Sequence, residues 1–283
     1  MNASVPIIGT SAGQTAAIAA RLVQARRSAR ALSGFPGVLP TSLQAAYACQ
    51  DAAITLWPDQ IAGWKVGYIS PARRDSDGDD RVTGPIFRRA VWIDQPGQRL
   101  DFPAFVGGFC AVEAEYVFRL GADAPAEKLH WHPDEAADLV AALHIGVETA
   151  GSPMAMINEL GPCAVAADFG NNAGLILGRE IPDWENLPDA DLRCSCSIEG
   201  REAALGGAGS IPGGLRGALA FALGRCARRG LPMRSGMLIT TGAATGIHDI
   251  VPGESARISF GRWGEIDCRA VTAVADLSLE PAR

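Results

Sequence analysis

The sequence predicts an α+β fold, because its helical and strand-forming patterns occupy different parts of the chain. Helical patterns fill the N-terminal part, and short strands separated by turn residues dominate the second half. The 283 residues are 48% hydrophobic and 20% charged, which suffices for one sizeable core. We therefore expect a single domain over residues 1–283, with a helical N-terminal segment at 1–60 and a β-rich core at 61–275.

Two helices are expected before the first strand. Thr10 or Ser11 can cap a helix that runs to about Leu32, since alanines give it high helix propensity and its apolar residues recur at helical spacing. The Gly- and Pro-containing residues 34–37 break that helix. A second helix is predicted over residues 41–56.

The first predicted strand covers residues 61–70 and carries Lys65 in its middle. Residue statistics alone favour an exposed lysine here, because Lys is almost never fully buried without a partner. The polar segment at 71–81 is predicted to form a loop.

Residues 109–120 predict a central strand in which Glu113 and Glu115 share one face and apolar residues form the other. Residues two apart in a strand lie about 6.5–7 Å apart. The two carboxylates can therefore converge on one cation, but without a cation they cannot easily ionise together in a half-buried site. A solvated strand face with two exposed glutamates is the alternative that these residues leave open.

A third carboxylate follows in residues 143–153, where a short strand would place Glu148 at its end. Between the two strands, residues 132–135 (His-Pro-Asp-Glu) predict the start of a helix that continues to about Leu143. This unit would bring Glu148 beside the first two glutamates. Three carboxylate ligands suit Mg²⁺ or Mn²⁺.

The rest of the chain predicts further strands and one helix. Asp168 and Asn171 or Asn172 precede an apolar strand and can orient ligands or water, although an Asx turn explains them as well. At the end of another buried strand, Thr241 and the neighbouring backbone amides can hold a substrate carboxylate. The remaining predicted elements are a hairpin at 191–205, a helix at 215–228, a strand at 237–242 and a closing hairpin at 251–274.

Six motifs, in order, carry a resemblance to a known family. They are Ala46-Tyr-Ala-Cys-Gln50, Gly63-Trp-Lys-Val-Gly67, Val112-Glu-Ala-Glu115, Ile145-Gly-Val-Glu148, Ala167-Asp168 leading to Gly178, and Gly236-Met-Leu-Ile-Thr-Thr-Gly242. The chain resembles the 2-keto-4-pentenoate (2-hydroxypentadienoate) hydratases and 4-oxalocrotonate decarboxylases of the fumarylacetoacetate hydrolase superfamily. The resemblance implies a mixed β-sandwich or roll of the fumarylacetoacetate hydrolase C-terminal-domain type, with peripheral helices.

The resemblance also implies a site. The assigned residues are Lys65 and Asp168 for catalysis, Ser70, Thr241 and Gly242 for substrate binding, and Glu113, Glu115 and Glu148 for the metal. Lys65 would be buried and would move a proton. Desolvation and a nearby cation are expected to lower its pKa, and the glutamates oppose this effect.

The implied reaction is metal-dependent addition of water to a 2-hydroxyalka-2,4-dienoate, which gives a 4-hydroxy-2-oxo acid. Decarboxylation of 4-oxalocrotonate and hydrolysis of acylpyruvates are the alternatives. A protein that binds a 2-oxo acid without turnover represents a different class. The resemblance also implies that residues 71–81 form a mobile loop near the site and that Gly84-Pro-Ile86 forms a turn like the Gly-x-Leu turn of the hydratases. The chain departs from the hydratases at Val82-Thr83, where they often carry an acid, and this departure bears on water addition.

Composition excludes several partners. The net charge of −6 and the lack of a basic block argue against nucleic acid or an anionic membrane surface. No basic residue precedes Arg21 and no apolar run reaches about 18 residues, so we expect a cytoplasmic protein without a signal peptide. The seven scattered cysteines suggest no disulfide framework. The expected partners are a small-molecule 2-oxo or 2-hydroxydienoate acid and further copies of the chain in a homo-oligomer.

Overall fold

The computed structural model describes residues 11–76 and 78–276, and it has the α+β architecture expected from the sequence. The helices are α1 (Ala12–Arg27), α2 (Leu43–Leu56), α3 (Pro133–Ala137), α4 (Ile157–Leu160), α5 (Pro162–Ala167) and α6 (Gly214–Arg228). The strands are β1 (Ile61–Tyr68), β2 (Arg81–Phe87), β3 (Val91–Ile93), β4 (Arg99–Ala104), β5 (Phe109–Leu120), β6 (Val140–Ser152), β7 (Asn172–Glu180), β8 (Arg193–Ile198), β9 (Arg201–Gly207), β10 (Leu238–Thr240), β11 (His248–Asp249), β12 (Ser255–Ser259) and β13 (Glu265–Thr272).

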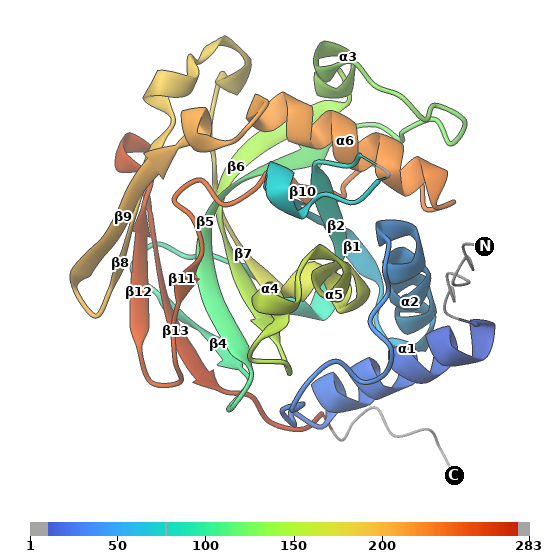
Figure 1. Cartoon of the computed structure of the whole chain (residues 1–283). Helices are drawn as coiled ribbons and strands as arrows, with labels where there is room; N and C mark the ends of the chain where they lie inside the picture. Colours follow the sequence, from blue (N-terminus) through green and yellow to red (C-terminus); the bar gives the residue numbers. More distant parts are fainter. Residues whose placement is uncertain (1–10, 77, 277–283) are drawn as a thin grey trace.

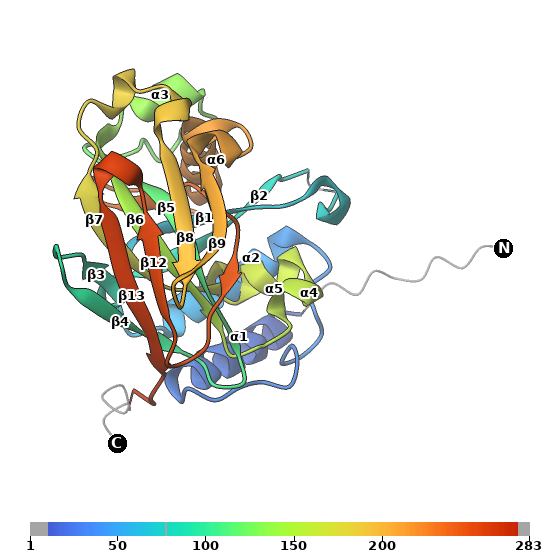
Figure 2. The ribbon, with the colours of Figure 1, turned by 90° about the vertical axis from the view of Figure 1, so that its left-hand side faces the viewer.

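The strands form two sheets. An 8-stranded mixed sheet has the order β2-β1-β10-β5-β6-β7-β3, with β11 paired to the remaining part of β5. A 5-stranded sheet has the order β4-β13-β12-β8-β9 and packs against it. Figure 1 shows α1 and α2 beside β1 and β2, α4 and α5 in front of the larger sheet, and α6 across its upper end. Figure 2 shows the smaller sheet facing the viewer.

The two N-terminal helices are present, but the first is shorter than predicted. Ser11 caps α1 by accepting a hydrogen bond from the backbone of Gln14, whereas Thr10 lies outside the described residues. The helix ends at Arg27 rather than near Leu32, because Ala29 adopts a left-handed φ of 49° that interrupts the helical backbone. The second helix, α2, matches its predicted range closely.

The helix predicted between the two glutamate strands is also shorter than expected. His132 caps α3, and Pro133 occupies its first turn as predicted, but the helix ends at Ala137. Val140 already pairs with Leu120, so the residues that were expected to be helical join the sheet instead. As a result, β6 begins early and Glu148 lies within the strand rather than at its end.

The Gly-Pro-Ile segment at 84–86 belongs to β2 and is not the predicted turn. Its residues pair with β1, so that Gly84 lies opposite Lys65. A β-carbon on Gly84 would lie 2.0 Å from the carbonyl oxygen of Phe169. The glycine therefore permits a close approach between the sheet and the segment that follows α5.

Three further predicted elements agree with the structure. The hairpin β8–β9 turns at Glu199 and Gly200, α6 follows the Gly-rich segment, and β12 and β13 form the closing hairpin. All seven cysteines are free thiols, and six of them are buried. Within residues 11–76 and 78–276, no helix is both long and apolar enough to span a bilayer.

Candidate metal and substrate site

Three glutamates converge between the two long central strands. β5 supplies Glu113 and Glu115, and the antiparallel β6 supplies Glu148, whose Cα is paired with that of Glu113. One carboxylate oxygen from each residue lies within 4.8 Å of the other two. All three side chains are buried, and Glu115 and Glu148 have 0% exposure. The alternative of a solvated strand face is therefore wrong.

The unsatisfied atoms of this cluster fit a divalent cation. Among the described residues, Glu113 Oε1, Glu115 Oε1 and Glu148 Oε2 are buried without a hydrogen-bond partner. Buried carboxylate oxygens are normally paired or coordinate a metal. When all groups are ionised, three carboxylates and the ammonium of Lys65 leave an excess of two negative charges, which a hard divalent cation would neutralise.

In Glu115 and Glu148, the other carboxylate oxygen accepts hydrogen bonds from neighbouring residues. Glu115 Oε2 accepts hydrogen bonds from the backbone N–H groups of Thr241 at 3.0 Å and Gly242 at 2.7 Å. Glu148 Oε1 accepts one from Asn172 Nδ2 at 3.1 Å. The amides that were predicted to hold a substrate carboxylate therefore orient a glutamate of the cluster, in the manner of outer-shell groups around metals.

Lys65 points into the same cluster from β1. Its Nζ lies 3.3 Å from Glu148 Oε1 and donates a hydrogen bond to Asn171 Oδ1 at 3.1 Å. The side chain is only 3% exposed, so the surface position that residue statistics favoured is wrong. The paired carboxylates explain how an ammonium group is tolerated at this depth.

The charges of the site perturb one another. Burial lowers the pKa of Lys65, but the charges of Glu148, Glu113 and Glu115 outweigh it and the pKa is raised. The lowered pKa predicted from the sequence concerns the metal-bound site, where the charge of a cation would oppose the effect of these carboxylates. Burial, together with Glu148, raises the pKa of Glu113 to about 7, and burial likewise raises the pKa of Glu115 and Glu148.

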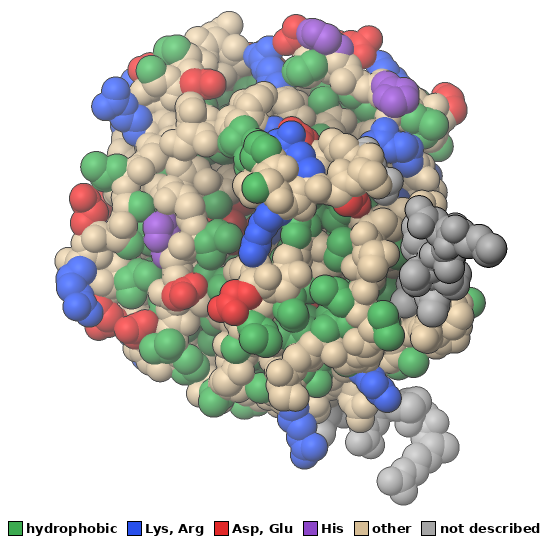
Figure 3. Space-filling view, viewed as in Figure 1, with side chains coloured by type: hydrophobic (Ala, Val, Ile, Leu, Met, Phe, Trp, Pro, Cys, Tyr) green, Lys and Arg blue, Asp and Glu red, His purple; other side chains and the backbone are tan. Residues whose placement is uncertain are grey.

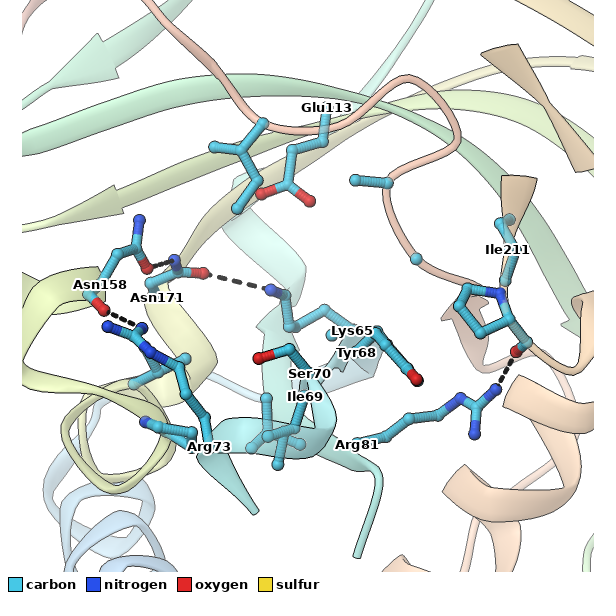
Figure 4. Close-up of a pocket in the computed structure, with 18 of the residues that line it drawn as sticks. Lys65, Tyr68, Ile69, Ser70, Arg73, Arg81, Glu113, Asn158, Asn171 and Ile211 are labelled. Carbon is cyan, nitrogen blue, oxygen red and sulfur yellow. Dashed lines mark hydrogen bonds between the residues drawn. The ribbon is translucent and has the colours of Figure 1, made fainter.

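A cavity of about 640 Å³ opens next to this cluster. Figure 4 shows Glu113 on one side, Lys65 in the middle, and Arg73 and Arg81 on the other side. Ser70, which was predicted to bind substrate, also lines the cavity, as do Thr241 and Gly242. Figure 3 shows basic side chains near the middle of this face, above α4 in the view of Figure 1.

Asp168 lies among different partners from those expected of a catalytic acid. Its two oxygens are occupied by Arg26 Nε at 2.5 Å and by the hydroxyl of Ser152 at 2.6 Å. Arg26 also donates to the carbonyl oxygens of Gly151 and Asn172. Asp168 does not appear among the described residues that line the cavity. The geometry gives it a positioning role, since it anchors the segment that carries Asn171 and Asn172.

Val82 and Thr83, which replace the expected acid, face opposite sides of β2. Val82 lines the cavity. Thr83 is fully buried on the other face, where its hydroxyl accepts from Arg229 Nη1 at 3.2 Å and its backbone N–H donates to Tyr47 OH at 2.9 Å. An acid at position 83 would therefore lie beside a guanidinium rather than in the cavity.

Sequence reasoning missed three of the charged residues that line the cavity, namely Arg73, Arg81 and Asp249. Both arginines lie near the ends of the polar segment 71–81, which was interpreted as a loop near the site. That position in the chain could have identified them as candidate cavity residues. Asp249 belongs to a two-residue strand that no periodicity could reveal.

Comparisons with known proteins were made by sequence and by structure. No family model matches the chain, and no curated protein matches its sequence. Among solved structures, 4-oxalocrotonate decarboxylase from Pseudomonas putida G7, complexed with magnesium and adipate, matches with a TM-score of 0.76 and 18% identity, over 95% of this chain and 100% of that chain.

Two further structures match a smaller part of the chain. Fumarylpyruvate hydrolase from Pseudomonas aeruginosa, in complex with Mn²⁺ and pyruvate, gives a TM-score of 0.54 and 18% identity over 77% of this chain and 91% of that chain. The 2-hydroxyhepta-2,4-diene-1,7-dioate isomerase from Mycobacterium marinum gives a TM-score of 0.54 and 16% identity over 76% of this chain and 77% of that chain. At such identities the likeness establishes the fold, so this chain shares the α+β fold of these enzymes.

Proposed function

We propose that the protein is a divalent-metal-dependent hydratase that adds water to a 2-hydroxyalka-2,4-dienoate and forms a 4-hydroxy-2-oxo acid. The observation that carries this proposal is the placement of Lys65 3.3 Å from Glu148, within a cluster of three buried glutamates that borders a cavity. A bound 2-oxygen and carboxylate would lie next to both a cation and a proton donor.

The cation would be Mg²⁺ or Mn²⁺, held by Glu113, Glu115 and Glu148. Once bound, it would supply Lewis-acid stabilisation of the negative charge that develops on the substrate's 2-oxygen. The backbone amides of Thr241 and Gly242 keep Glu115 oriented for this purpose.

Lys65 carries the first proton transfer in this proposal. Its ammonium group donates a proton to carbon 5 of the dienol, and the resulting amine accepts the proton of the 2-hydroxyl group. The product of this step is a 2-oxo-3-enoate, to which water then adds at carbon 4. Asn171 accepts a hydrogen bond from Lys65 and thereby fixes the direction of the amine.

Decarboxylation of 4-oxalocrotonate is the second candidate, and the arginines favour it. Arg73 and Arg81 line the cavity away from Glu113, where two guanidinium groups would suit a second substrate carboxylate. The decarboxylase structure that matches this chain was solved with adipate, a dicarboxylate. Hydrolysis of an acylpyruvate is the third candidate, and a fumarylpyruvate hydrolase is among the matching solved structures.

The test is a panel of 2-hydroxydienoates, 4-oxalocrotonate and acylpyruvates incubated with Mg²⁺ or Mn²⁺, with products identified by NMR. Formation of a 4-hydroxy-2-oxo acid supports the hydratase. Release of CO₂ from 4-oxalocrotonate, with 2-hydroxypentadienoate untouched, replaces it with the decarboxylase. Binding of a 2-oxo acid without turnover of any panel member would identify a binding protein and contradict the proposal.

A further inference from the structure

Water addition requires a proton acceptor in the cavity. The water molecule must lose a proton as its oxygen bonds to carbon 4, and a positioned base accelerates such a step. Among the described residues that line the cavity, the carboxylates are Glu113 and Asp249, and histidine is absent. Glu113 belongs to the cluster that fits the cation. Asp249 is therefore the carboxylate that remains available, on the assumption that the proposed hydration is correct.

The other polar side chains of the cavity are poor acceptors. Lys65 already serves the first proton transfer, and its Nζ is held by Glu148 Oε1 at 3.3 Å and Asn171 Oδ1 at 3.1 Å, whereas arginine has no acceptor atom. The hydroxyl of Tyr68 already accepts a hydrogen bond from Arg74 Nη2 at 2.9 Å. These observations leave Asp249 as the group with the right chemistry.

The strand register places Asp249 on the correct side of the sheet. β11 pairs with β5 so that Asp249 lies opposite Ala111. Opposite residues of an antiparallel pair point to the same face, and Ala111 shares its face with Glu113, two residues further along the strand. Diagonal neighbours of this kind lie about 7–8 Å apart. A substrate whose first two carbons face the glutamates would place its fourth carbon within this span.

We propose that Asp249 is the catalytic base for water addition. One proton of the water passes to the Asp249 carboxylate as the oxygen bonds to carbon 4. The electron pair of the 3,4 double bond forms a 2,3 double bond, and the carbonyl pair moves to the 2-oxygen. Carbon 3 then takes the proton from Asp249, which restores the 2-oxo group and the carboxylate.

The experiment separates the two steps of the reaction. Wild type and Asp249→Asn are each given 2-hydroxypenta-2,4-dienoate and Mg²⁺, and NMR follows both 2-oxopent-3-enoate and the hydrated product. We expect Asp249→Asn to form 2-oxopent-3-enoate at the wild-type rate and to hydrate it about 10²–10⁴-fold more slowly, so that this compound accumulates. Formate added to Asp249→Ala should restore part of the hydration, because Asp249 is exposed.

Asp183→Asn is the matched control, since Asp183 is an exposed aspartate that does not line the cavity and Asn tolerates its left-handed backbone. It should leave both steps unchanged. Hydration by Asp249→Asn at the wild-type rate would overturn the role of Asp249, as would an equal loss of both steps with metal content retained. A wild-type protein that forms 2-oxopent-3-enoate without hydrating it would instead refute the hydratase function, and with it this role.

Discussion

The closed end of the cavity, around the three glutamates and Lys65, is built from long paired strands, whereas its open end, around Arg73 and Asp249, is built from one 3-10 turn and the two-residue strand β11. At the closed end, Glu115 and Glu148 are fully buried and held by hydrogen bonds from β7 and from the two residues that follow β10. At the open end, Arg73 and Asp249 are exposed. A buried charge cannot lose its partner without a large penalty, whereas an exposed side chain can change at little cost to folding.

In the proposed function, this difference would separate the chemistry from the choice of reaction. Enolate formation would depend on the buried cluster, and hydration or decarboxylation would depend on groups at the open end. Substitutions at the closed end should therefore abolish every reaction of the protein. Substitutions at the open end should change which substrate is used or how far the reaction proceeds.

The largest effect is expected for Lys65→Ala. Removal of a positioned proton donor should lower turnover by about 10²–10⁴-fold, measured by the disappearance of 2-hydroxypentadienoate. Lys65→Arg should not restore it, because guanidinium stays protonated. Lys128→Ala removes the other lysine of the chain, which lies at the surface, and should behave as wild type. Near-normal turnover by Lys65→Ala would reduce Lys65 to a structural residue.

The second effect concerns the pH dependence of stability after chelation. Burial first, and then Glu148, raises the pKa of Glu113 from 4.5 to about 7 in the folded chain. A raised carboxyl pKa means that the folded state binds this proton more tightly than the unfolded state does. The contribution of Glu113 to the free energy of unfolding is therefore fully present below about pH 4.5 and is lost as the pH rises through about 7. The free energy of unfolding of chelated protein should fall by on the order of 3 kcal/mol over this range.

Urea denaturation at several pH values measures this dependence. Added Mg²⁺ or Mn²⁺ should reverse the loss near pH 7, because a bound cation stabilises the ionised carboxylates. Chelated protein that becomes more stable between pH 4.5 and 7 would show that the cluster is ionised and paired in some other way. The same titration on Glu113→Gln should give a flatter profile.

A smaller effect should identify the substrate class. If a second substrate carboxylate binds at the open end, Arg73→Gln should raise the KM for 4-oxalocrotonate by about tenfold, since a hydrogen bond to a charged group is lost. The KM for 2-hydroxypentadienoate should stay unchanged. Arg201→Gln is the control, because Arg201 is exposed on β9 and does not line the cavity. Equal effects of Arg73→Gln on both substrates would contradict the assignment of the open end to selectivity.

The smallest effect compares two positions in β2. In the Asp249→Asn background, Val82→Asp places a carboxylate in the cavity and should recover hydration by about tenfold. Thr83→Asp places it beside Arg229 and should recover nothing. Circular dichroism would confirm that both variants fold. Recovery by Thr83→Asp alone would show that β2 presents its other face to the substrate.

Sequence patterns predicted most elements and the contents of the closed end. Period-two alternation revealed the strand that carries Glu113 and Glu115, because this pattern is local. Lys65 was assigned to the site through the resemblance carried by the ordered motifs. Boundaries set by tertiary contacts were missed. The predicted helix after His132 was too long, because pairing with β5 draws residue 140 onward into the sheet.

The open end could not be read from the sequence for a physical reason. Its residues come from segments that are distant in the chain and irregular in structure, so Arg73 and Asp249 belong to no common periodicity. Likewise, nothing local indicates that Asp168 pairs with Arg26, which lies 142 residues away. Only the folded chain brings such groups together.

The central claim is that the three glutamates hold one divalent cation, and metal content tests it most directly. Wild type, Glu113→Gln and the exposed-site control Glu202→Gln are purified without chelator, equilibrated with Mn²⁺, dialysed and analysed by mass spectrometry for metal. The account predicts about one cation per chain for wild type and the control, and a loss of most of it for Glu113→Gln, because the cation then lacks one of its three carboxylate ligands. Equal metal content in Glu113→Gln and wild type would contradict the account.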